Sequence, residues 1–218
     1  MNFNIKSISK KLYGIWSKFL DLFGDVKIFK YPMWIVLDPS QYDMVGEKIA
    51  KAIEILQPGD IVLRGYDCYL DSHFIDGQYS HGAIAVSKDQ IVHSIAPAVE
   101  SIHPISFMMC DRIAIVRPKN QELVGEAVKI AKEMLECGVK YDFDFNTEDD
   151  SEVYCFELAA KCYPSVEFKI HEMSYLGGFL TKNVFLGSSF LENENFEVVF
   201  EYNPRKSIDF PTVTCNDK

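Results

Sequence analysis

Two short segments in the middle of the chain, residues 80–86 (SHGAIAV) and 90–95 (QIVHSI), alternate small or polar side chains with apolar ones. An alternation with a period of two is typical of a β-strand, and the polar residues 87–89 between the segments are typical of a tight turn. The sequence therefore predicts an antiparallel hairpin, which requires the fold to contain a sheet. The hairpin also carries His81 and His93 on neighbouring strands, so we expect their imidazoles to lie close together.

A cysteine lies far downstream, at the predicted start of a helix. In residues 149–158 (DDSEVYCFEL), Ser151 is expected to cap the helix and Cys155 to fall in its first turn. A thiol reacts as a thiolate, and both a helix N-terminus and a neighbouring imidazolium lower its pKa. We therefore expect Cys155 to be a nucleophile with a depressed pKa, His81 its general base, and His93 the residue that orients the base. This combination is typical of a cysteine hydrolase.

Each of these residues also has a plainer interpretation. A free cysteine in a helix is often a core residue, and a histidine on a strand is often structural.

Small side chains beside the first histidine, at Ala83 and Ala85, are expected to leave room for the helix that carries Cys155. A further alternative is a zinc site, which would lack the close ligand pairs of structural zinc sites. Its four ligands would be His81, His93, His103 and Cys110.

Composition limits the classes of function. The chain has 218 residues, of which 48% are hydrophobic, enough for one domain with a full core. Its net charge of −10 argues against a nucleic-acid partner, since phosphate binding needs clustered Lys and Arg. The six cysteines form no CxxC pair, no segment resembles a signal peptide, and no apolar run approaches the ~20 residues that span a bilayer. We expect a cytoplasmic protein with reduced thiols and with chemistry that needs no cofactor and no metal.

The N-terminal region has a different pattern from the rest of the chain. Residues 5–23 place apolar side chains three and four positions apart, with lysines elsewhere, which predicts an amphipathic helix. We expect this helix to pack on its own domain or on a partner protein, although Trp16 and the lysines would also suit a membrane surface. The chain is accordingly divided into an N-terminal helical segment (1–30), one hydrolase domain (31–205) and a loosely ordered tail (206–218).

Periodicity predicts that the domain is an antiparallel sheet packed on helices. Helices are predicted over residues 43–56 and 122–137, and strands over residues 33–37, 60–64, 98–102, 112–117 and 196–202. The loop over residues 65–79 is rich in aromatic and acidic side chains, and we expect it to form a wall of the substrate site.

Four of these segments occur in an order that resembles a known family. Residues 56–63 (LQPGDIVL), 80–86, 91–99 and 154–158 (YCFEL) are similar to the circularly permuted NlpC-type papain-like cysteine hydrolases of the YiiX/YebB-like group, over about residues 56–165. In that family the histidine strand precedes the nucleophile. The twelve-residue spacing of the two histidines is also similar to that of the lecithin–retinol acyltransferase-like proteins, which act on lipid acyl groups.

The resemblance implies an α+β, circularly permuted papain-like fold, with an antiparallel sheet packed on helices. It implies Cys155 as the nucleophile, His81 as the base and His93 at the third, orienting position. Three tyrosines near these motifs are expected to bind the substrate: Tyr79, Tyr141 and Tyr154. The implied reaction is that of an amidase or peptidase, which cleaves an amide or ester through a thioester acyl-enzyme. The alternatives are a lipid-directed acyltransferase or phospholipase with the same triad, and a catalytically silent binding module.

Overall fold

The computed structural model describes residues 27–30, 33–36, 42–67, 77–147, 151–175 and 180–204 of the chain. The predicted helix over residues 5–23 and the predicted tail from residue 206 lie outside the described residues. No helix in the described part of the chain is long and apolar enough to cross a bilayer.

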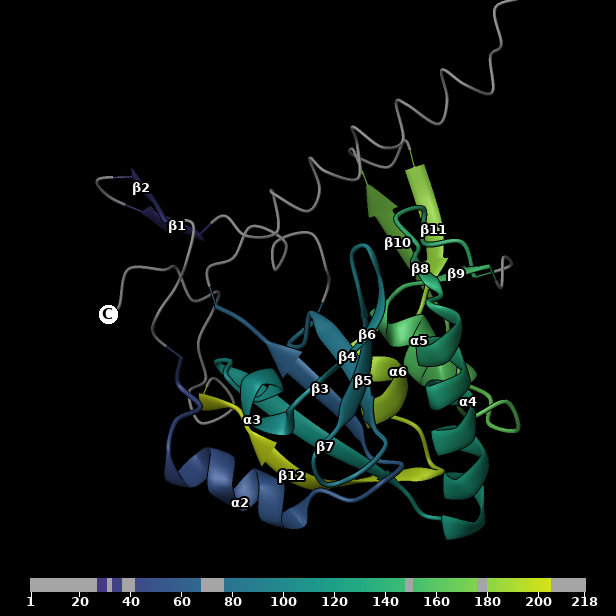
Figure 1. The fold of residues 1–218 in the computed structure, drawn as a ribbon. Helices are drawn as coiled ribbons and strands as arrows, with labels where there is room; N and C mark the ends of the chain where they lie inside the picture. Colours follow the sequence, from purple (N-terminus) through teal and green to yellow (C-terminus); the bar gives the residue numbers. More distant parts are fainter. Residues whose placement is uncertain are drawn as a thin grey trace, which may run out of the picture.

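An eight-stranded, curled sheet forms the centre of the molecule (Figure 1). Its strands, in spatial order, are β12 (Phe196–Tyr202), β7 (Arg112–Pro118), β3 (Ile61–Gly65), β4 (His81–Ala85), β5 (Ile91–Ile95), β6 (Ala98–Ile102), β8 (Lys140–Tyr141) and β9 (Glu152–Val153). Neighbouring strands are antiparallel except for β8 and β9. The predicted hairpin is confirmed, and it pairs Ala83 of β4 with His93 of β5.

Helices cover both faces of this sheet (Figure 1). One face carries α2 (Glu47–Ile55) and α3 (Pro104–Phe107), and the other carries α4 (Val124–Cys137), α5 (Cys155–Lys161) and α6 (Gly187–Leu191). A short 3-10 helix, η2 (Gln121–Leu123), leads into α4, and Gly138 ends α4 in the left-handed conformation expected of a helix-terminating glycine.

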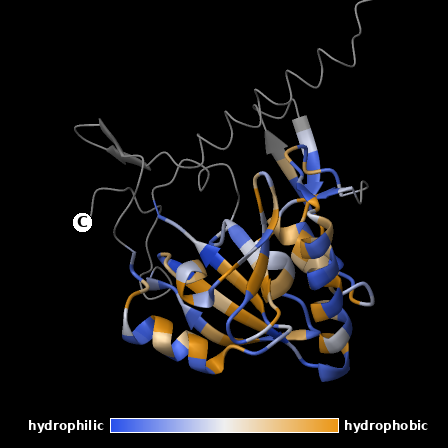
Figure 2. Ribbon diagram, in the orientation of Figure 1, coloured by the Kyte–Doolittle hydropathy of each residue, from blue (hydrophilic) through white to orange (hydrophobic). Residues whose placement is uncertain are grey.

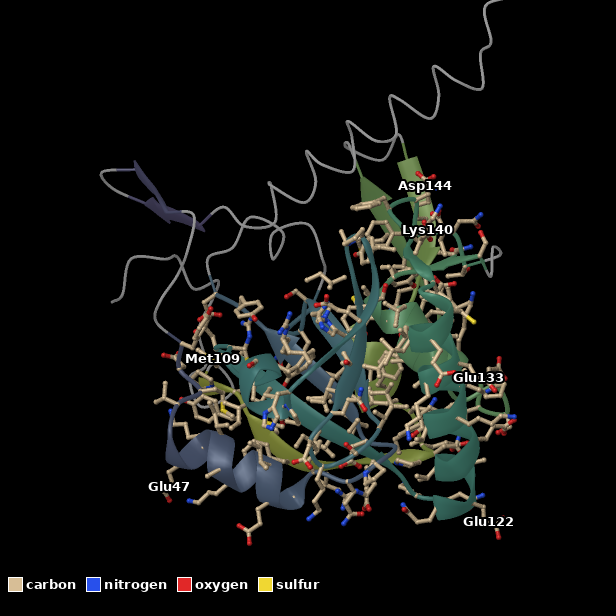
Figure 3. The ribbon with its side chains drawn as sticks, in the orientation of Figure 1. Glu47, Met109, Glu122, Glu133, Lys140 and Asp144 are labelled. Atoms are coloured by element: carbon tan, nitrogen blue, oxygen red, sulfur yellow. The ribbon has the colours of Figure 1, made fainter. Side chains whose placement is uncertain are left out.

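The alternation of side chains along the strands creates two separate cores. Ile61 and Leu63 of β3 pack with α4, α5 and α6, whereas Val62 of the same strand packs with α2 and α3. All five residues of β3 are buried, since both faces of this central strand are covered. Figure 2 shows the result, with hydrophobic residues along the central strands and hydrophilic residues on the outer surfaces of α2 and α4. Glu47 of α2 and Glu133 of α4 point outward from these surfaces (Figure 3).

A buried ion pair connects α2 to the sheet. Asp60, which has no exposed surface, accepts hydrogen bonds from Arg117 Nε and a terminal nitrogen of Arg117 at 2.7 and 2.8 Å. Arg117 also donates to the carbonyl of Ile55 at the end of α2, over 2.7 Å. Because both charges are paired and hydrogen-bonded, their burial is compensated.

Some elements differ from the sequence-based expectations. Residues 27–30, assigned to the N-terminal helical segment, form strand β1 (Lys27–Lys30), which pairs with β2 (Met33–Val36) in a separate two-stranded sheet. Strands β10 (His171–Tyr175) and β11 (Leu180–Val184) form another separate pair. Neither β10, β11 nor α6 is predicted as a defined element, because their sequences lack a clear period.

Candidate active site

Cys155 is the first residue of α5 and is 5% exposed. The helix begins later than expected, because Tyr154 and not Ser151 is the N-cap, while residues 152–153 form β9. The carboxylate of Glu157 accepts the backbone N–H of Tyr154 at 3.3 Å, and the first intrahelical bond is from Leu158 N to Tyr154 O. The backbone N–H groups of Cys155 and the next two residues therefore have no acceptor within the helix.

Gly82 lets α5 approach strand β4. A Cβ atom at Gly82 would lie only 2.7 Å from Cδ1 of Phe156, the residue after the cysteine. This contact replaces the expected role of Ala83 and Ala85, which face the opposite core, under α2 and α3. The expectation was wrong because alternate residues of a strand point to opposite faces, and α5 covers the face of Gly82.

The two predicted histidines are in direct contact. His81 Nε2 lies 3.0 Å from His93 Nδ1, and the rings meet edge to face with centroids 5.2 Å apart. His93 is 1% exposed, whereas His81 is half-buried. The far nitrogen of His93, Nε2, lies 3.3 Å from Oε1 of Glu100, its partner across the β5–β6 pair. The structure thus adds a carboxylate beyond the second histidine.

The hydrogen bond between the rings restricts their tautomers. For His81 Nδ1 to accept a proton from a thiol, His81 must carry its own proton on Nε2 and donate it to His93 Nδ1. His93 then carries its proton on Nε2, which lies 3.3 Å from Oε1 of Glu100 but does not have the geometry of a hydrogen bond to it. This inferred arrangement of protons leaves His81 Nδ1 as the basic nitrogen of the pair.

Burial keeps the thiol and both imidazoles neutral. It raises the pKa of Cys155 to about 11, although backbone hydrogen bonds from Gly82 and Phe156, together with the charge of Arg64, act in the opposite direction. Burial, followed by the charge of Arg64, lowers the pKa of His93 to about 3, and the same causes hold the pKa of His81 well below its usual value. The predicted depressed pKa of Cys155 is therefore wrong, because desolvation of the thiolate outweighs the helix N-terminus.

Arg64 and Glu100 are charged neighbours of the histidines that sequence reasoning missed. Arg64 of β3 lies directly across from His81 in the β3–β4 register. Its only signal in the sequence is a single charge in an otherwise apolar strand. Glu100 occupies an outward position of a half-exposed strand, where a carboxylate needs no special explanation.

The three predicted substrate-binding tyrosines are in different environments. Tyr79 is 2% exposed, and its hydroxyl donates to Glu201 over 2.8 Å. Tyr154 is 1% exposed, and its hydroxyl accepts the backbone N–H of Phe185 at 2.6 Å. Both rings therefore belong to the core and not to a substrate surface. Tyr141 is half-buried on β8, so its substrate role stays a prediction.

The proposed zinc ligands do not come together. His103 is the N-cap of α3 and accepts the backbone N–H of Ile105 at 3.2 Å. The thiol of Cys110 is buried against the carbonyls of Met108 and Arg112. Within the described ranges, no three His, Cys, Asp or Glu side chains converge in a way that could hold a metal ion.

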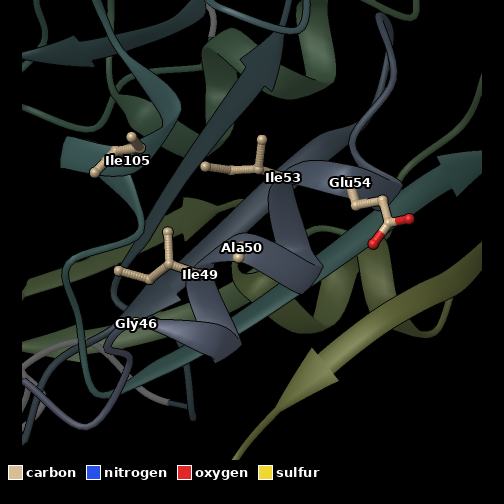
Figure 4. Close-up of a pocket in the computed structure, with 6 residues that line it drawn as sticks. All are labelled: Gly46, Ile49, Ala50, Ile53, Glu54 and Ile105. Atoms are coloured by element: carbon tan, nitrogen blue, oxygen red, sulfur yellow. The ribbon is translucent and has the colours of Figure 1, made fainter.

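One open pocket lies between α2 and α3, with a volume of about 530 Å³. It is lined by apolar side chains, among them Ile49, Ile53 and Ile105, with Glu54 at its side (Figure 4). None of the candidate catalytic residues lines it. The histidine pair and Cys155 therefore lie outside this pocket.

Comparisons with known proteins agree with this fold. The family model described as permuted papain-like amidase enzyme, YaeF/YiiX, C92 family, matches residues 55–214. Among solved structures, this chain is similar to a crystal structure described as that of the metalloprotein YiiX from Escherichia coli O157:H7. The TM-score is 0.56 and the sequence identity is 16%, over 69% of this chain and 99% of that chain. No curated protein matches the sequence significantly. Since the family model covers well over half of the sequence, the chain belongs to the permuted papain-like amidase family.

Proposed function

We propose that this protein is a cysteine-nucleophile hydrolase that cleaves an amide, or an ester, through a thioester acyl-enzyme. The observation that carries the proposal is the position of Cys155 at the N-terminus of α5, which packs against strand β4. His81 is the first residue of β4, and its ring is hydrogen-bonded to that of His93 on β5. The family described as amidase supports the general class of reaction. We assign Cys155 as nucleophile, His81 as general base and His93 as a positioning residue.

The first half-reaction forms the acyl-enzyme. Because thiol and imidazole are both neutral at rest, His81 takes the thiol proton as the sulfur of Cys155 attacks the carbonyl carbon. The tetrahedral oxyanion would be stabilised by backbone N–H groups at the start of α5, which have no helical acceptor. His81 then gives the proton to the leaving amine or alcohol, and the thioester remains on Cys155.

The second half-reaction is hydrolysis of the thioester. His81 accepts a proton from a water molecule that attacks the acyl carbon, and returns the proton to the sulfur as the acid product leaves. The hydrogen bond from His81 to His93, together with the carboxylate of Glu100 3.3 Å from the far nitrogen of His93, would stabilise the positive charge that forms on the base. We include a cytoplasmic location in the proposal, since all four cysteines of the described part are free thiols.

The direct test is acylation by a chromogenic ester. With p-nitrophenyl acetate, we expect a burst of nitrophenolate and an acetyl group on Cys155, located by mass spectrometry after proteolysis. Cys155→Ala should abolish the burst. Cys137→Ser is the matched control, because Cys137 is an exposed cysteine at the end of α4. A burst that survives in Cys155→Ala would exclude this residue as the nucleophile.

The histidine roles are separated by substitution. His81→Ala removes the proposed base and should reduce turnover by about 10²–10⁴-fold. His93→Gln keeps a hydrogen-bond acceptor for His81 and should retain part of the activity. Equal and complete loss in both variants, with circular dichroism unchanged, would contradict this division of roles.

Acyl transfer from a lipid is a second candidate function. It is favoured by the histidine at the third position, because His93 does contact His81, at 3.0 Å, as the acyltransferase-like spacing implies. A Cys155-dependent lipid product from phospholipid vesicles would support it. A protein in which Cys155 is acylated by neither ester nor lipid would instead be a binding module that has kept the fold.

A further inference from the structure

Arg64 is a buried cation without a carboxylate partner in the described part of the chain. Its side chain is 9% exposed, and its Nε is buried without a hydrogen-bond partner. Among the described residues, its one hydrogen bond is a long contact of 3.4 Å to the carbonyl of Phe107. The other two arginines of the central sheet do have partners, since Arg112 pairs with Asp67 at 3.1 Å and Arg117 pairs with Asp60.

The guanidinium of Arg64 lies beside the candidate catalytic residues. Its central carbon is 4.4 Å from the ring centroid of Phe107 and 5.3 Å from that of Tyr66. The Phe107 ring also contacts both imidazoles, with centroids 5.7 Å from His81 and 5.6 Å from His93. The cation and the histidine pair therefore surround the same aromatic ring, and the charge of Arg64 acts on the thiol of Cys155 as well.

An unpaired buried charge is costly, and the two aromatic rings offset only part of that cost. A planar guanidinium with free N–H groups matches a carboxylate or phosphate in a two-point contact. One cation balances one negative charge, so a carboxylate leaves the buried site neutral, whereas a phosphate dianion does not. The Nε atom, which has no partner among the described residues, and the adjacent imidazoles thus point to an anion that arrives with the substrate.

We propose that Arg64 binds a carboxylate of the substrate next to the bond that Cys155 attacks, so that the preferred substrates are amides or esters bearing a carboxylate near the scissile group. This inference rests on the proposed function and specifies its substrate class. Arg64 acts in it as a specificity-determining residue, because it contacts the substrate away from the reacting carbon.

Two alkylating reagents that differ in one group test the proposal. Iodoacetate and iodoacetamide both transfer a carbon to the sulfur of Cys155 and release iodide, but only iodoacetate carries a carboxylate. In the full-length protein at pH 8, we expect iodoacetate to alkylate Cys155 faster than iodoacetamide. Arg64→Met should lower the ratio of the two rates by about tenfold or more, since it removes a charge-assisted hydrogen bond. Arg64→Lys should give an intermediate ratio.

Lys48→Met is the matched control, because Lys48 is also a cation over an aromatic ring, 4.0 Å from the centroid of Tyr202. Lys48 belongs to α2, on the face of the sheet opposite to the core that contains Cys155, so its substitution should leave the ratio unchanged. A ratio that is the same in the wild type and in Arg64→Met would overturn the proposal.

Binding without chemistry gives an independent measurement. At constant ionic strength, sodium acetate should raise the melting temperature of the wild type and of Cys155→Ala relative to chloride, and should not do so in Arg64→Met. Stabilisation by phosphate and not by acetate would overturn the carboxylate assignment in favour of a phosphate. If neither reagent alkylates Cys155, the nucleophile assignment fails, and the acetate measurement alone then decides the role of Arg64.

Discussion

At the scale of single residues, desolvation decides the resting state of the candidate site. Cys155 and His93 are almost fully buried, and burial favours the neutral form of each group. The site therefore starts from a thiol and an imidazole, and not from a thiolate–imidazolium pair. A proton must move from Cys155 to His81 during attack, which makes the orientation of His81 more important than a low thiol pKa.

The neutral thiol predicts the pH dependence of alkylation. The pKa of Cys155 is raised to about 11. At any pH well below this value, the thiolate fraction should increase about tenfold for each unit by which the pH is raised. The rate constant for iodoacetamide at Cys155, followed by peptide mass spectrometry from pH 6 to pH 9, should rise throughout this range. A plateau between pH 6 and pH 8 would instead demonstrate a thiolate–imidazolium pair.

The neutral His93 predicts the pH dependence of stability. Its pKa is about 3 in the folded protein and near 6.5 in the unfolded chain, so only the unfolded chain takes up this proton between these values. The free energy of unfolding should therefore fall as the pH drops below 6.5, by up to about 1.4 kcal/mol per pH unit from this group. Urea unfolding at pH 7, 6 and 5 measures the slope.

His93→Gln is the control for this slope, because Gln keeps a hydrogen-bonding side chain but does not titrate. The variant should lose less stability than the wild type on acidification. Parallel curves for the two proteins would show that His93 does not contribute.

At the scale of elements, the site depends on how closely α5 packs against β4. Helix α5 is short, with seven residues, and Phe156 near its start packs against Gly82 of β4. The Glu157–Lys161 ion pair, at 3.0 Å, lies within the helix and supports the helix itself. The register of the β4–β5 hairpin pairs Ala83 with His93, which places His81, two residues earlier on β4, diagonally across from His93. The position of Cys155 relative to the histidines therefore depends on the surface at which α5 packs against the β4–β5 hairpin.

Gly82→Ala should disturb that surface. The added methyl would lie 2.7 Å from Cδ1 of Phe156 and 3.6 Å from Leu63, so α5 or the aromatic ring must move. We expect a loss of about 1–3 kcal/mol of stability and a larger loss of the acylation burst than Cys137→Ser causes. Thermal unfolding and the burst assay measure the two effects.

Phe156→Leu in the Gly82→Ala background supplies the rescue, since the smaller side chain leaves space for the methyl. It should recover part of the stability and part of the burst. If Gly82→Ala alone is as stable and active as the wild type, the close approach of α5 is not required.

At the scale of the whole molecule, one sheet serves two cores with different purposes. The core under α4, α5 and α6 carries the nucleophile, whereas the core under α2 and α3 surrounds the histidines and Arg64 with Phe107. Because the nucleophile belongs to one core and the histidines to the other, the proposed site is complete only when both cores have formed. The N-terminal segment remains outside this description.

The predicted helix over residues 5–23 gives a test at this scale. Leaving its apolar face in water would forgo on the order of 1.5–3 kcal/mol for each large side chain, so we propose that it packs on the rest of the protein. Deletion of residues 1–25 should lower the melting temperature, and the full-length protein should not float with anionic liposomes. Flotation at low salt that is lost on deletion, with no change in melting temperature, would favour a membrane surface instead.

Much of the site could be predicted from local patterns. The hairpin with His81 and His93, the helix that begins near Cys155, and the helix that becomes α4 each follow from a period of two or of three to four residues within one segment. The order of the motifs resembles the family, and the family match confirms that resemblance. The predicted start of α5 is wrong because serine is a favoured N-cap residue, whereas Ser151 here precedes the short strand β9 and Tyr154 is the N-cap.

The sequence alone therefore specified which residues form the hairpin and the nucleophile helix, because hydrophobic period and capping are properties of neighbouring residues. Only the tertiary structure decided that Gly82 provides the close approach, that Arg64 and Glu100 join the histidines, and that Cys155 is a neutral thiol. These features depend on contacts between segments that lie far apart in the chain. The pKa of a buried group is set by the atoms that remove it from water, and these atoms belong to other segments and not to its own neighbours in the sequence.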